Sequence, residues 1–312
     1  MTKVNAKSLR GQVDDYIIRA ISAQLPDDHV LIDTGWLEVD DVKGLDSTKT
    51  AVCYSGIDWE NTDCIESRVN AHKLITQTSQ AQIHIGNSNG AYYFSYWAEF
   101  IRQNPQHFFD EVYTTPPQIE KLFLSLNRKE YPHRRFFLDL LDQHNLAKLG
   151  FVSRPNQPIG KIRYYMDVHD NERDFRFPND IHGLGDADIW SKFFVNVVVE
   201  TTKHTNVFLS EKTWKPIIGL RPFLILGDQQ LYPKLKEHGF DTFDDVFGTW
   251  WQDADWRNRA RSIIDILASF GKHEKDLNSL YLHLQPRLLY NRNNFIAYMD
   301  INHNKICNLG LV

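Results

Sequence analysis

The 312-residue chain has few cysteines, no long hydrophobic run and no excess of positive charge. Its three cysteines, Cys53, Cys64 and Cys307, are too few and too scattered for a disulfide framework or a closed zinc site. No stretch of about 18 uncharged apolar residues occurs, and the first residues lack the apolar segment of a signal peptide. These absences predict a soluble, cytoplasmic protein that does not span a membrane.

What is present is a composition that can build a large core. Hydrophobic residues make up 42%, aromatic residues 13% and charged residues 24% of the chain, which excludes a disordered or fibrous protein. The length suggests two domains.

The net charge is −5, so the chain has no overall positive charge that would attract nucleic acid or an anionic membrane. Charge is nevertheless unevenly placed along the chain. Residues 1–117 carry 9 basic and 16 acidic side chains (−7), residues 118–164 carry 9 and 4 (+5), and residues 165–190 carry 2 and 7 (−5). The basic stretch between two acidic ones indicates that one part of the chain binds an anion.

Short apolar runs alternate with helical patterns from the start of the chain, and this predicts α/β units with mostly parallel sheets. In the first part we expect strands at 29–34, 51–55, 82–86 and 111–114 and helices at 64–75 and 92–103. Pro116 and Pro117 then form a candidate linker. In the second part we expect strands at 121–126, 150–153, 193–201 and 222–226, and helices at 132–149, 210–219, 229–237, 253–270 and 274–299. Residues 154–190 are predicted to be an irregular excursion.

The segment 206–227 is the densest in candidate functional residues. Ser210 is a good N-cap and Gly219 a good C-terminal stop, and they bracket a helix of barely two turns. Glu211, Lys212 and Lys215 lie on its first turns, where free N–H groups and the helix dipole favour an anion. The alternative is an ordinary capped helix whose charges face water.

Three blocks of sequence carry a resemblance to a known family. Residues 210–216 (SEKTWKP) precede the strand 222–227 (PFLILG), residues 231–243 read LYPKLKEHGFDTF, and residues 124–135 read LSLNRKEYPHRR. In their order along the chain, the three blocks resemble the nucleotide-sugar-binding signature of the fucosyltransferase and exostosin-like glycosyltransferases and of uncharacterised viral and bacterial relatives. No comparable match covers residues 1–116.

The resemblance implies the GT-B fold, in which two Rossmann-like domains face each other across a cleft. Residues 1–117 would then form an acceptor domain, residues 118–272 the nucleotide-sugar-binding domain, and residues 273–312 a C-terminal helix that packs back on the first domain. The implied activity is metal-independent transfer of a sugar to an unknown hydroxyl on a glycan, small molecule or protein. The nucleotide-sugar is a co-substrate, and no cofactor is implied.

The resemblance also implies roles on the donor side. Glu211 would contact the ribose and Lys212 the diphosphate, with Ser210 beside them. Glu200 stands where the fucosyltransferases place a Glu-Asn pair, although Thr201 replaces the Asn. Arg128 matches a phosphate-binding arginine of GT-B enzymes, and we expect Arg128 and Lys212 to take part in catalysis.

The basic stretch also contains His133, Arg134 and Arg135 at the start of a helix. Basic side chains stabilise the charge that develops on a diphosphate leaving group without any metal. Neighbouring residues of a helix point about 100° apart, so at most two of these three can face one site. We expect Arg134, rather than Arg135, to bind the donor.

The sequence contains fewer signals for the residues that bind the acceptor than for those that bind the donor. An inverting transferase needs a base that removes a proton from the acceptor hydroxyl, and open α/β sheets bind ligands at the carboxyl ends of their strands. The candidates for the acceptor side are Asp33, Asp58, Glu60, Asn87 and Asn89, and Asp58 is the preferred base. Each of them is alternatively a turn or cap residue. The acidic residues of 167–174 have no repeated ligand spacing, which favours a solvated loop over a metal site.

Two other functions stay open. The chain is alternatively a non-catalytic module that binds a nucleotide-sugar or a glycan. A glycosyltransferase that acts on a hydroxymethylated base of DNA is disfavoured by the −7 sum of residues 1–117, because phosphate neutralisation supplies most of the affinity for DNA. The sequence leaves the oligomeric state open.

Overall fold

The computed structural model describes residues 19–25, 30–33, 50–54, 73–76, 91–93, 95–109, 118–127, 130–154, 184, 187–201, 207, 209–272 and 276–308, with only the backbone at 30–33, 50–54, 73–76 and 91–93. The chain divides into two compact units. Unit 1 consists of Met1–Gln103, His204–Phe208 and Tyr298–Val312, and unit 2 of Asn104–Lys203 and Leu209–Ala297. The domain boundaries expected after residues 117 and 272 stay predictions, because 110–117 and 273–275 lie outside the described residues.

Unit 1 contains a parallel sheet. Its strands are β1 (Val30–Asp33), β2 (Thr50–Tyr54), β3 (Lys73–Thr76) and β4 (Ala91–Tyr93), in the order β1-β2-β3-β4, and α3 (Tyr96–Gln103) follows. The strands predicted at 29–34 and 51–55 are confirmed, whereas those predicted at 82–86 and 111–114 lie outside the described residues.

Two helix predictions in unit 1 were wrong at their ends. Residues 73–76 form a strand, although the prediction extended a helix to residue 75, because Ile75 and Thr76 are β-branched and favour the pleated sheet. Residues 92 and 93 also belong to a strand, and the helix begins only at Tyr96. Ser95 sets that start, since its Oγ accepts a hydrogen bond from the N–H of Ala98 at 3.3 Å.

Unit 2 contains the second parallel sheet, which confirms the mixed α/β prediction. Its strands are β5 (Lys121–Ser125), β6 (Gly150–Val152), β7 (Phe193–Val199) and β8 (Phe223–Leu226), in the order β6-β5-β7-β8. The helical segments are η3 (Pro105–His107), α4 (Pro132–Gln143), η4 (Ala147–Leu149), α5 (Ala187–Trp190), α6 (Glu211–Ile218), α7 (Leu231–Glu237), α8 (Asp244–Phe247), η6 (Trp250–Gln252), α9 (Trp256–Lys272) and α10 (Leu277–Cys307). The last of these continues into unit 1.

One helix of unit 2 is shorter than predicted. The pattern suggested a helix from Pro132 to residue 149, but α4 ends at Gln143. Asn145 adopts a left-handed conformation with φ of 55°, which a continuous helix cannot contain. The remaining predicted residues form the short η4 instead.

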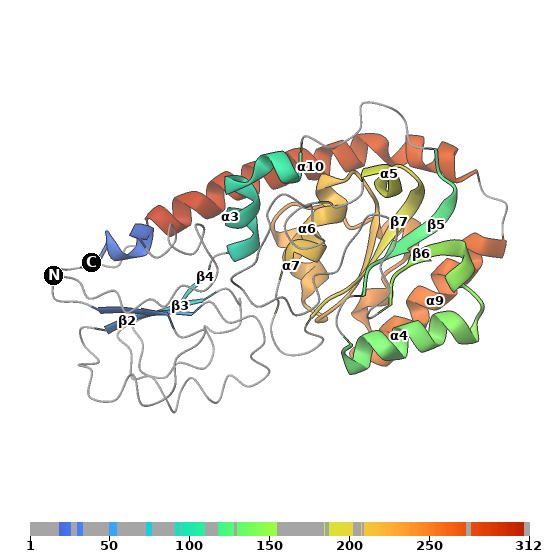
Figure 1. Cartoon of the computed structure of the whole chain (residues 1–312), viewed down its shortest axis with the longest axis horizontal. Helices are drawn as coiled ribbons and strands as arrows, with labels where there is room; N and C mark the ends of the chain where they lie inside the picture. Colours follow the sequence, from blue (N-terminus) through green and yellow to red (C-terminus); the bar gives the residue numbers. More distant parts are fainter. Residues whose placement is uncertain are drawn as a thin grey trace. The chain divides into compact units, whose positions relative to one another are not determined.

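Helices cover both faces of the second sheet (Figure 1). Phe193 of β7 contacts Trp190 on one face, while its neighbour Phe194 contacts Phe270 of α9 on the other, with ring centroids 5.2 and 5.9 Å apart. All seven residues of β7 are buried, as expected for a central strand of a parallel sheet. Figure 1 shows α4 and α9 together on one side of the strands and α6 with α10 on the other.

Candidate functional site

The candidate site lies where β7 ends and α6 begins, both within unit 2. Ser210 has an extended backbone and is the N-cap of α6, because its Oγ accepts a hydrogen bond from the N–H of Lys212 at 3.1 Å. The predicted N-cap and helix are thereby confirmed, and Gly219 is the C-cap. In a parallel α/β sheet the carboxyl ends of the strands are the edge at which ligands bind.

Glu200, the residue after β7, is the centre of a buried polar cluster. Its side chain has no solvent exposure. Its two carboxylate oxygens accept hydrogen bonds from Ser210 Oγ at 2.7 Å, and one of them also accepts from Thr213 Oγ1 at 2.6 Å. The carboxylate therefore fixes the first turn of α6 to the end of β7.

Glu211 and Lys212 form an ion pair at the N-terminus of α6. Lys212 Nζ lies 2.7 Å from Glu211 Oε1, and the hydroxyl oxygens of Thr201 and Ser210 are each 3.4 Å from the same nitrogen. The Glu211 side chain is 7% exposed and that of Lys212 is 26% exposed. The pair is thus partly sheltered, with the ammonium as its more accessible member.

The electrostatic surroundings of Glu211 favour its charged form. Burial by itself would raise the pKa of this carboxyl group, but the charge and hydrogen bond of Lys212 and the charge of Lys215 outweigh it. The pKa of Glu211 consequently lies below its ordinary value, and the carboxylate is ionised at neutral pH.

The two basic residues buried at the start of α4 contact the backbone at the end of β7. His133 Nε2 lies 2.7 Å from the carbonyl oxygen of Glu200, and Arg134 Nε donates to the carbonyl oxygen of Val199 at 3.2 Å. The Arg134 guanidinium also lies over the ring of Tyr131, 5.0 Å from its centroid. By contrast, Arg135 is exposed. Arg134, predicted to bind the donor, is therefore placed against the strand that carries Glu200.

Asn127, just after β5, is a buried residue that sequence reasoning did not single out. Its N–H donates to Ser153 Oγ at 2.7 Å, and its side-chain amide donates to Ser125 Oγ at 3.1 Å. Its Oδ1 accepts no hydrogen bond from any residue that the structure describes. Because β5 and β7 are adjacent and parallel, Asn127 and Glu200 follow strands that end at the same edge of the sheet.

Thr213 was also missed, although the sequence contains a signal for it. It stands three residues after the N-cap, the position from which a polar side chain reaches back in a capping box. For His133 the sequence indicates only a basic side chain, and no sequence pattern indicates its contact with a carbonyl oxygen 67 residues away.

No described contact connects the other predicted site residues with the polar cluster around Glu200. Asp33 is the last residue of β1, and only its backbone is described. The remaining candidates lie outside the described residues: Arg128, Asp58, Glu60, Asn87 and Asn89. Within the described ranges, no three His, Cys, Asp or Glu side chains are grouped so that they could hold a metal ion.

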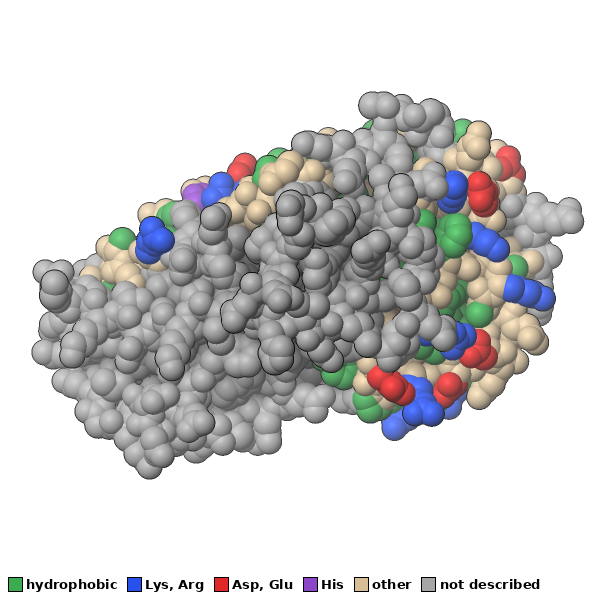
Figure 2. Space-filling model, in the orientation of Figure 1, with side chains coloured by type: hydrophobic (Ala, Val, Ile, Leu, Met, Phe, Trp, Pro, Cys, Tyr) green, Lys and Arg blue, Asp and Glu red, His purple; other side chains and the backbone are tan. Residues whose placement is uncertain are grey.

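The described surface is mixed in charge. Where side chains of unit 2 are coloured in Figure 2, Lys and Arg lie interspersed with Asp and Glu. In the part of the chain that the structure describes, no helix is both long and apolar enough to cross a membrane.

No family model and no curated protein matches the chain. Among solved structures, the crystal structure of the DNA-modifying enzyme beta-glucosyltransferase, determined in the presence and absence of its substrate uridine diphosphoglucose, is 15% identical to this chain. The match covers 98% of this chain and 97% of that one, with a TM-score of 0.39.

Proposed function

We propose that this protein is a glycosyltransferase that moves a sugar from a nucleotide-sugar to a hydroxyl acceptor. In this proposal, the second unit binds the donor at the N-terminus of α6, and the first unit supplies the acceptor side. The family is that of the fucosyltransferase and exostosin-like GT-B enzymes, which residues 210–216 resemble.

The observation that carries the proposal is the local structure of residues 210–216. This segment forms the capped N-terminus of α6, the next described helix after β7, which is an inner strand of the parallel sheet, and the Lys212 side chain in its first turn is 26% exposed. A helix N-terminus at the carboxyl end of a parallel strand is a ready site for a diphosphate. Lys212 adds a point charge, which suits phosphate oxygens.

The proposed chemistry follows from the charge of the leaving group. As the bond between the sugar and the diphosphate breaks, negative charge develops on the diphosphate, and Lys212 together with the dipole of α6 stabilises it. Arg128 is proposed to add a second positive charge, since it follows β5, the strand next to β7. Glu211 is proposed to accept hydrogen bonds from the ribose hydroxyls.

The acceptor hydroxyl must lose a proton as it attacks the sugar. We propose Asp58 as the base that removes it, with Asp33, Asn87 and Asn89 orienting the acceptor. Exchange of Asp58 for Asn would remove the base while keeping the size of the side chain, so the rate of transfer should fall by about 10²–10⁴-fold. Measured donor affinity should stay unchanged if Asp58 acts on the acceptor side only.

The proposal is tested by measuring donor hydrolysis and sugar transfer over a panel of nucleotide-sugars and acceptors. Wild-type protein should turn over at least one donor, and Lys212→Ala should lower kcat by about 10²–10³-fold, the usual cost of losing one electrostatic group at a developing charge. Lys234→Ala is the matched control, because Lys234 also pairs with a glutamate, Glu237, at 2.9 Å but lies on α7.

The outcomes separate the alternatives. Binding of nucleotide-sugars without turnover of any donor would indicate a non-catalytic binding module. If Lys212→Ala and Lys234→Ala lowered kcat equally, the N-terminus of α6 would not be the place where the diphosphate is stabilised.

A further inference from the structure

Every large apolar side chain that is exposed in the described part of the chain lies on α10. We propose that this helix is the interface between two copies of the chain, which pair through it in antiparallel orientation. The inference does not depend on the proposed function, because no residue of the donor site takes part. The four side chains that form the apolar stripe of α10 are Leu282, Leu289, Tyr290 and Ile296, and Ile301 follows them on the same helix.

The first step is that α10 is apolar on two faces. Its inner face packs on the core of unit 2, where Phe295 is fully buried and stacks on Trp214 of α6 with ring centroids 4.8 Å apart. On the outer face, Leu282, Leu289 and Ile296 are spaced by seven residues, which places them close to one row along the helix. A helix that packs only on its own protein has polar residues on its outer face. The row therefore indicates that a second surface covers this face.

The second step is that an exposed aromatic ring lies beside this row. The Tyr290 hydroxyl donates a hydrogen bond to the carbonyl oxygen of Gly239 at 3.1 Å, while the residue is 56% exposed. The hydrogen bond already holds the side chain in place, so its ring loses little conformational freedom when a partner binds. Fixed tyrosine rings of this kind are common anchors of protein interfaces.

The third step is that the stripe does not repel a second copy of itself. In the described stretch 282–296, none of the exposed positions holds Asp, Glu, Lys or Arg. The absence of exposed basic residues there also disfavours an anionic membrane as the occupant, because helices that lie on membranes carry Lys and Arg beside their apolar row. An uncharged apolar stripe suits an identical stripe, which a two-fold axis brings against it.

The fourth step is the orientation of the pair. The next exposed charge after the stripe is that of Asp300. In a parallel pair the two Asp300 carboxylates would face each other, and like charges in contact disfavour an interface. In an antiparallel pair, Leu289 of each copy packs against Ile296 of the other, and the two carboxylates lie at opposite ends of the contact.

The area of the stripe suits a pair of moderate affinity. Its four residues are 42–56% exposed. Side chains of this size expose roughly 100 Å² each at such fractions, so each copy would bury about 400 Å² of apolar surface through them. This is about half of the 800 Å² or so that one partner buries in a standard interface, and roughly half of a typical interface is apolar. The remaining area would come from the polar residues between them.

The first test is the mass of the wild-type protein in solution. Sedimentation velocity is measured over protein concentrations from about 1 to 200 µM, because dimers form by mass action. We expect the average mass to rise from that of one chain toward that of two, with a Kd of about 1–100 µM, as for an interface of this size. A single chain at every concentration would overturn the proposal. Growth beyond two chains would also overturn it, because a two-fold pair is closed.

The second test places a charge in the stripe. Leu289→Lys and Ile296→Glu should each weaken dimerisation at least about tenfold, because a charge is buried without a partner at two places in the pair. Their melting temperatures should stay close to that of the wild type, since both residues are exposed in the single chain. Gln143→Lys is the matched control, because it introduces a charge at an exposed position of α4. If the two stripe variants dimerised as tightly as Gln143→Lys, the interface would not be on α10.

A mixture of the two stripe variants tests the antiparallel orientation. In a mixed antiparallel pair, the lysine introduced at position 289 lies opposite the glutamate introduced at position 296, and the other contact is still Leu289 with Ile296. The mixture should therefore contain more dimer than either variant alone at the same total concentration. A parallel pair brings position 289 against position 289 and gains no such contact. A mixture as monomeric as its components would overturn the antiparallel arrangement.

Discussion

Ser210 makes two kinds of hydrogen bond with one hydroxyl group. Its oxygen accepts from the N–H of Lys212, and its proton is donated to the Glu200 carboxylate. The first interaction caps α6, and the second satisfies a fully buried carboxylate. Loss of the hydroxyl therefore affects both a helix terminus and a buried carboxyl group.

Exchange of Ser210 for Ala should lower the free energy of unfolding by about 1–3 kcal/mol, which combines the loss of an N-cap with a poorly satisfied buried group. Chemical denaturation followed by circular dichroism measures the change. Ser279→Ala is the control, because the Ser279 hydroxyl also donates to a carboxylate, that of Asp276, but the residue is exposed at the start of α10. Its effect should stay within about 0.5 kcal/mol. If both changes lowered the free energy of unfolding equally, the hydrogen bonds of the Glu200 cluster would contribute no more to stability than an exposed one.

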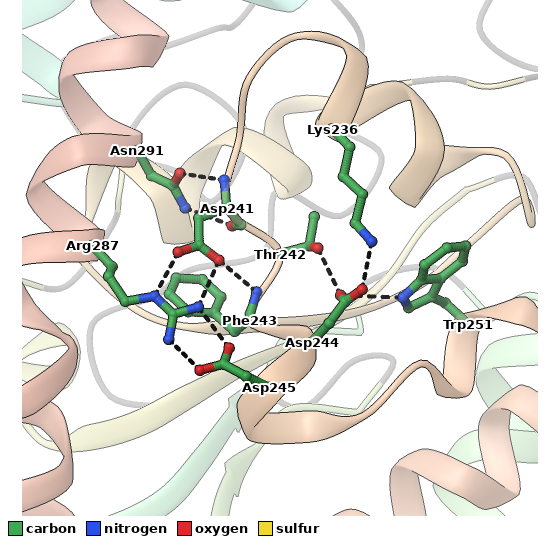
Figure 3. A network of polar contacts seen from close by, with 9 residues as sticks. All are labelled: Lys236, Asp241, Thr242, Phe243, Asp244, Asp245, Trp251, Arg287 and Asn291. Carbon is green, nitrogen blue, oxygen red and sulfur yellow. Dashed lines mark hydrogen bonds and ion pairs between the residues drawn. The ribbon is translucent and has the colours of Figure 1, made fainter.

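At the scale of elements, α10 is attached to the segment between α7 and α8 by a polar network (Figure 3). Arg287 of α10 binds the carboxylates of Asp241 and Asp245, with distances from 2.5 to 2.9 Å. Asn291, one turn later, exchanges two hydrogen bonds with the backbone of Asp241, both at 2.8 Å. Phe243, whose φ of 57° is unusual for a residue with a side chain, is buried under this network.

The network should make stability depend on pH in the acid range. The hydrogen bonds of Arg287 hold the pKa of Asp245 below its ordinary value. A carboxyl group whose pKa is lower in the folded protein stabilises the fold above its unfolded pKa of about 4 and loses that contribution as pH falls through the folded value.

Arg287→Met should therefore reduce the free energy of unfolding by about 1 kcal/mol near pH 7, since the network is partly exposed. The difference between wild type and variant should shrink below about pH 4. Urea unfolding at a series of pH values measures both quantities. A difference that persists unchanged at low pH would mean that the packing of Arg287 on Phe243, rather than its charge, is what stabilises the contact.

Exchange of glycine for alanine should have opposite effects on stability at two positions, one in a strand and one in a helix. An added Cβ at Gly150 of β6 would lie 2.6 Å from the ring of Phe123, which is buried in the adjacent strand β5. An added Cβ at Gly271 of α9 would also lie 2.6 Å from its nearest atom, but that atom is the terminal methyl of Leu149, a half-buried side chain.

Gly150→Ala should therefore destabilise the protein by about 1–3 kcal/mol, because the ring cannot move without disturbing the core. Gly271→Ala should be neutral or stabilising by up to about 1 kcal/mol, because the methyl group can rotate away and alanine favours the helix. Thermal unfolding of the two variants side by side measures the contrast. Similar losses of stability in both would contradict this explanation.

Elements were predictable from sequence where a local pattern decides them. The apolar run of β7, the N-cap Ser210 and Pro132 at the first position of α4 each determine their element within a few residues. The prediction failed at residues 73–75 and 92–93, which belong to strands β3 and β4 although their spacing is helical. It failed again at the end of α4, where a single left-handed Asn145 stops the helix.

The candidate site was predictable only in its linear part. Residues 210–212 are contiguous, so their cap and charges can be read from the sequence. The contacts of Glu200 with Thr213 and of His133 with the Glu200 carbonyl depend on how strands and helices pack, and no local pattern encodes them. Arg134 shows the same limit, since its charge suggested a ligand while the fold places it against the β7 backbone.

At the scale of the whole molecule, formal charge is distributed unevenly along the sequence, with −7 over residues 1–117 and +5 over residues 118–164. Negative charge on the proposed acceptor side disfavours a polyanionic acceptor. Duplex DNA should accordingly bind weakly, without the steep loss of affinity on adding salt that marks phosphate contacts. A titration of labelled duplex over a salt series measures this, and tight, strongly salt-dependent binding would favour the DNA-modifying alternative.

The central claim is that the N-terminus of α6 binds the diphosphate of a nucleotide-sugar. Its most direct test is the melting temperature of the wild type and of Lys212→Ala in the presence of each nucleoside diphosphate and nucleotide-sugar. A ligand at about 100 times its Kd adds roughly 2.7 kcal/mol to the stability of the protein that binds it. We predict that at least one ligand raises the melting temperature of the wild type by several degrees and that Lys212→Ala loses most of this shift. If no ligand shifts the wild type, or if Lys212→Ala responds equally, the claim is contradicted.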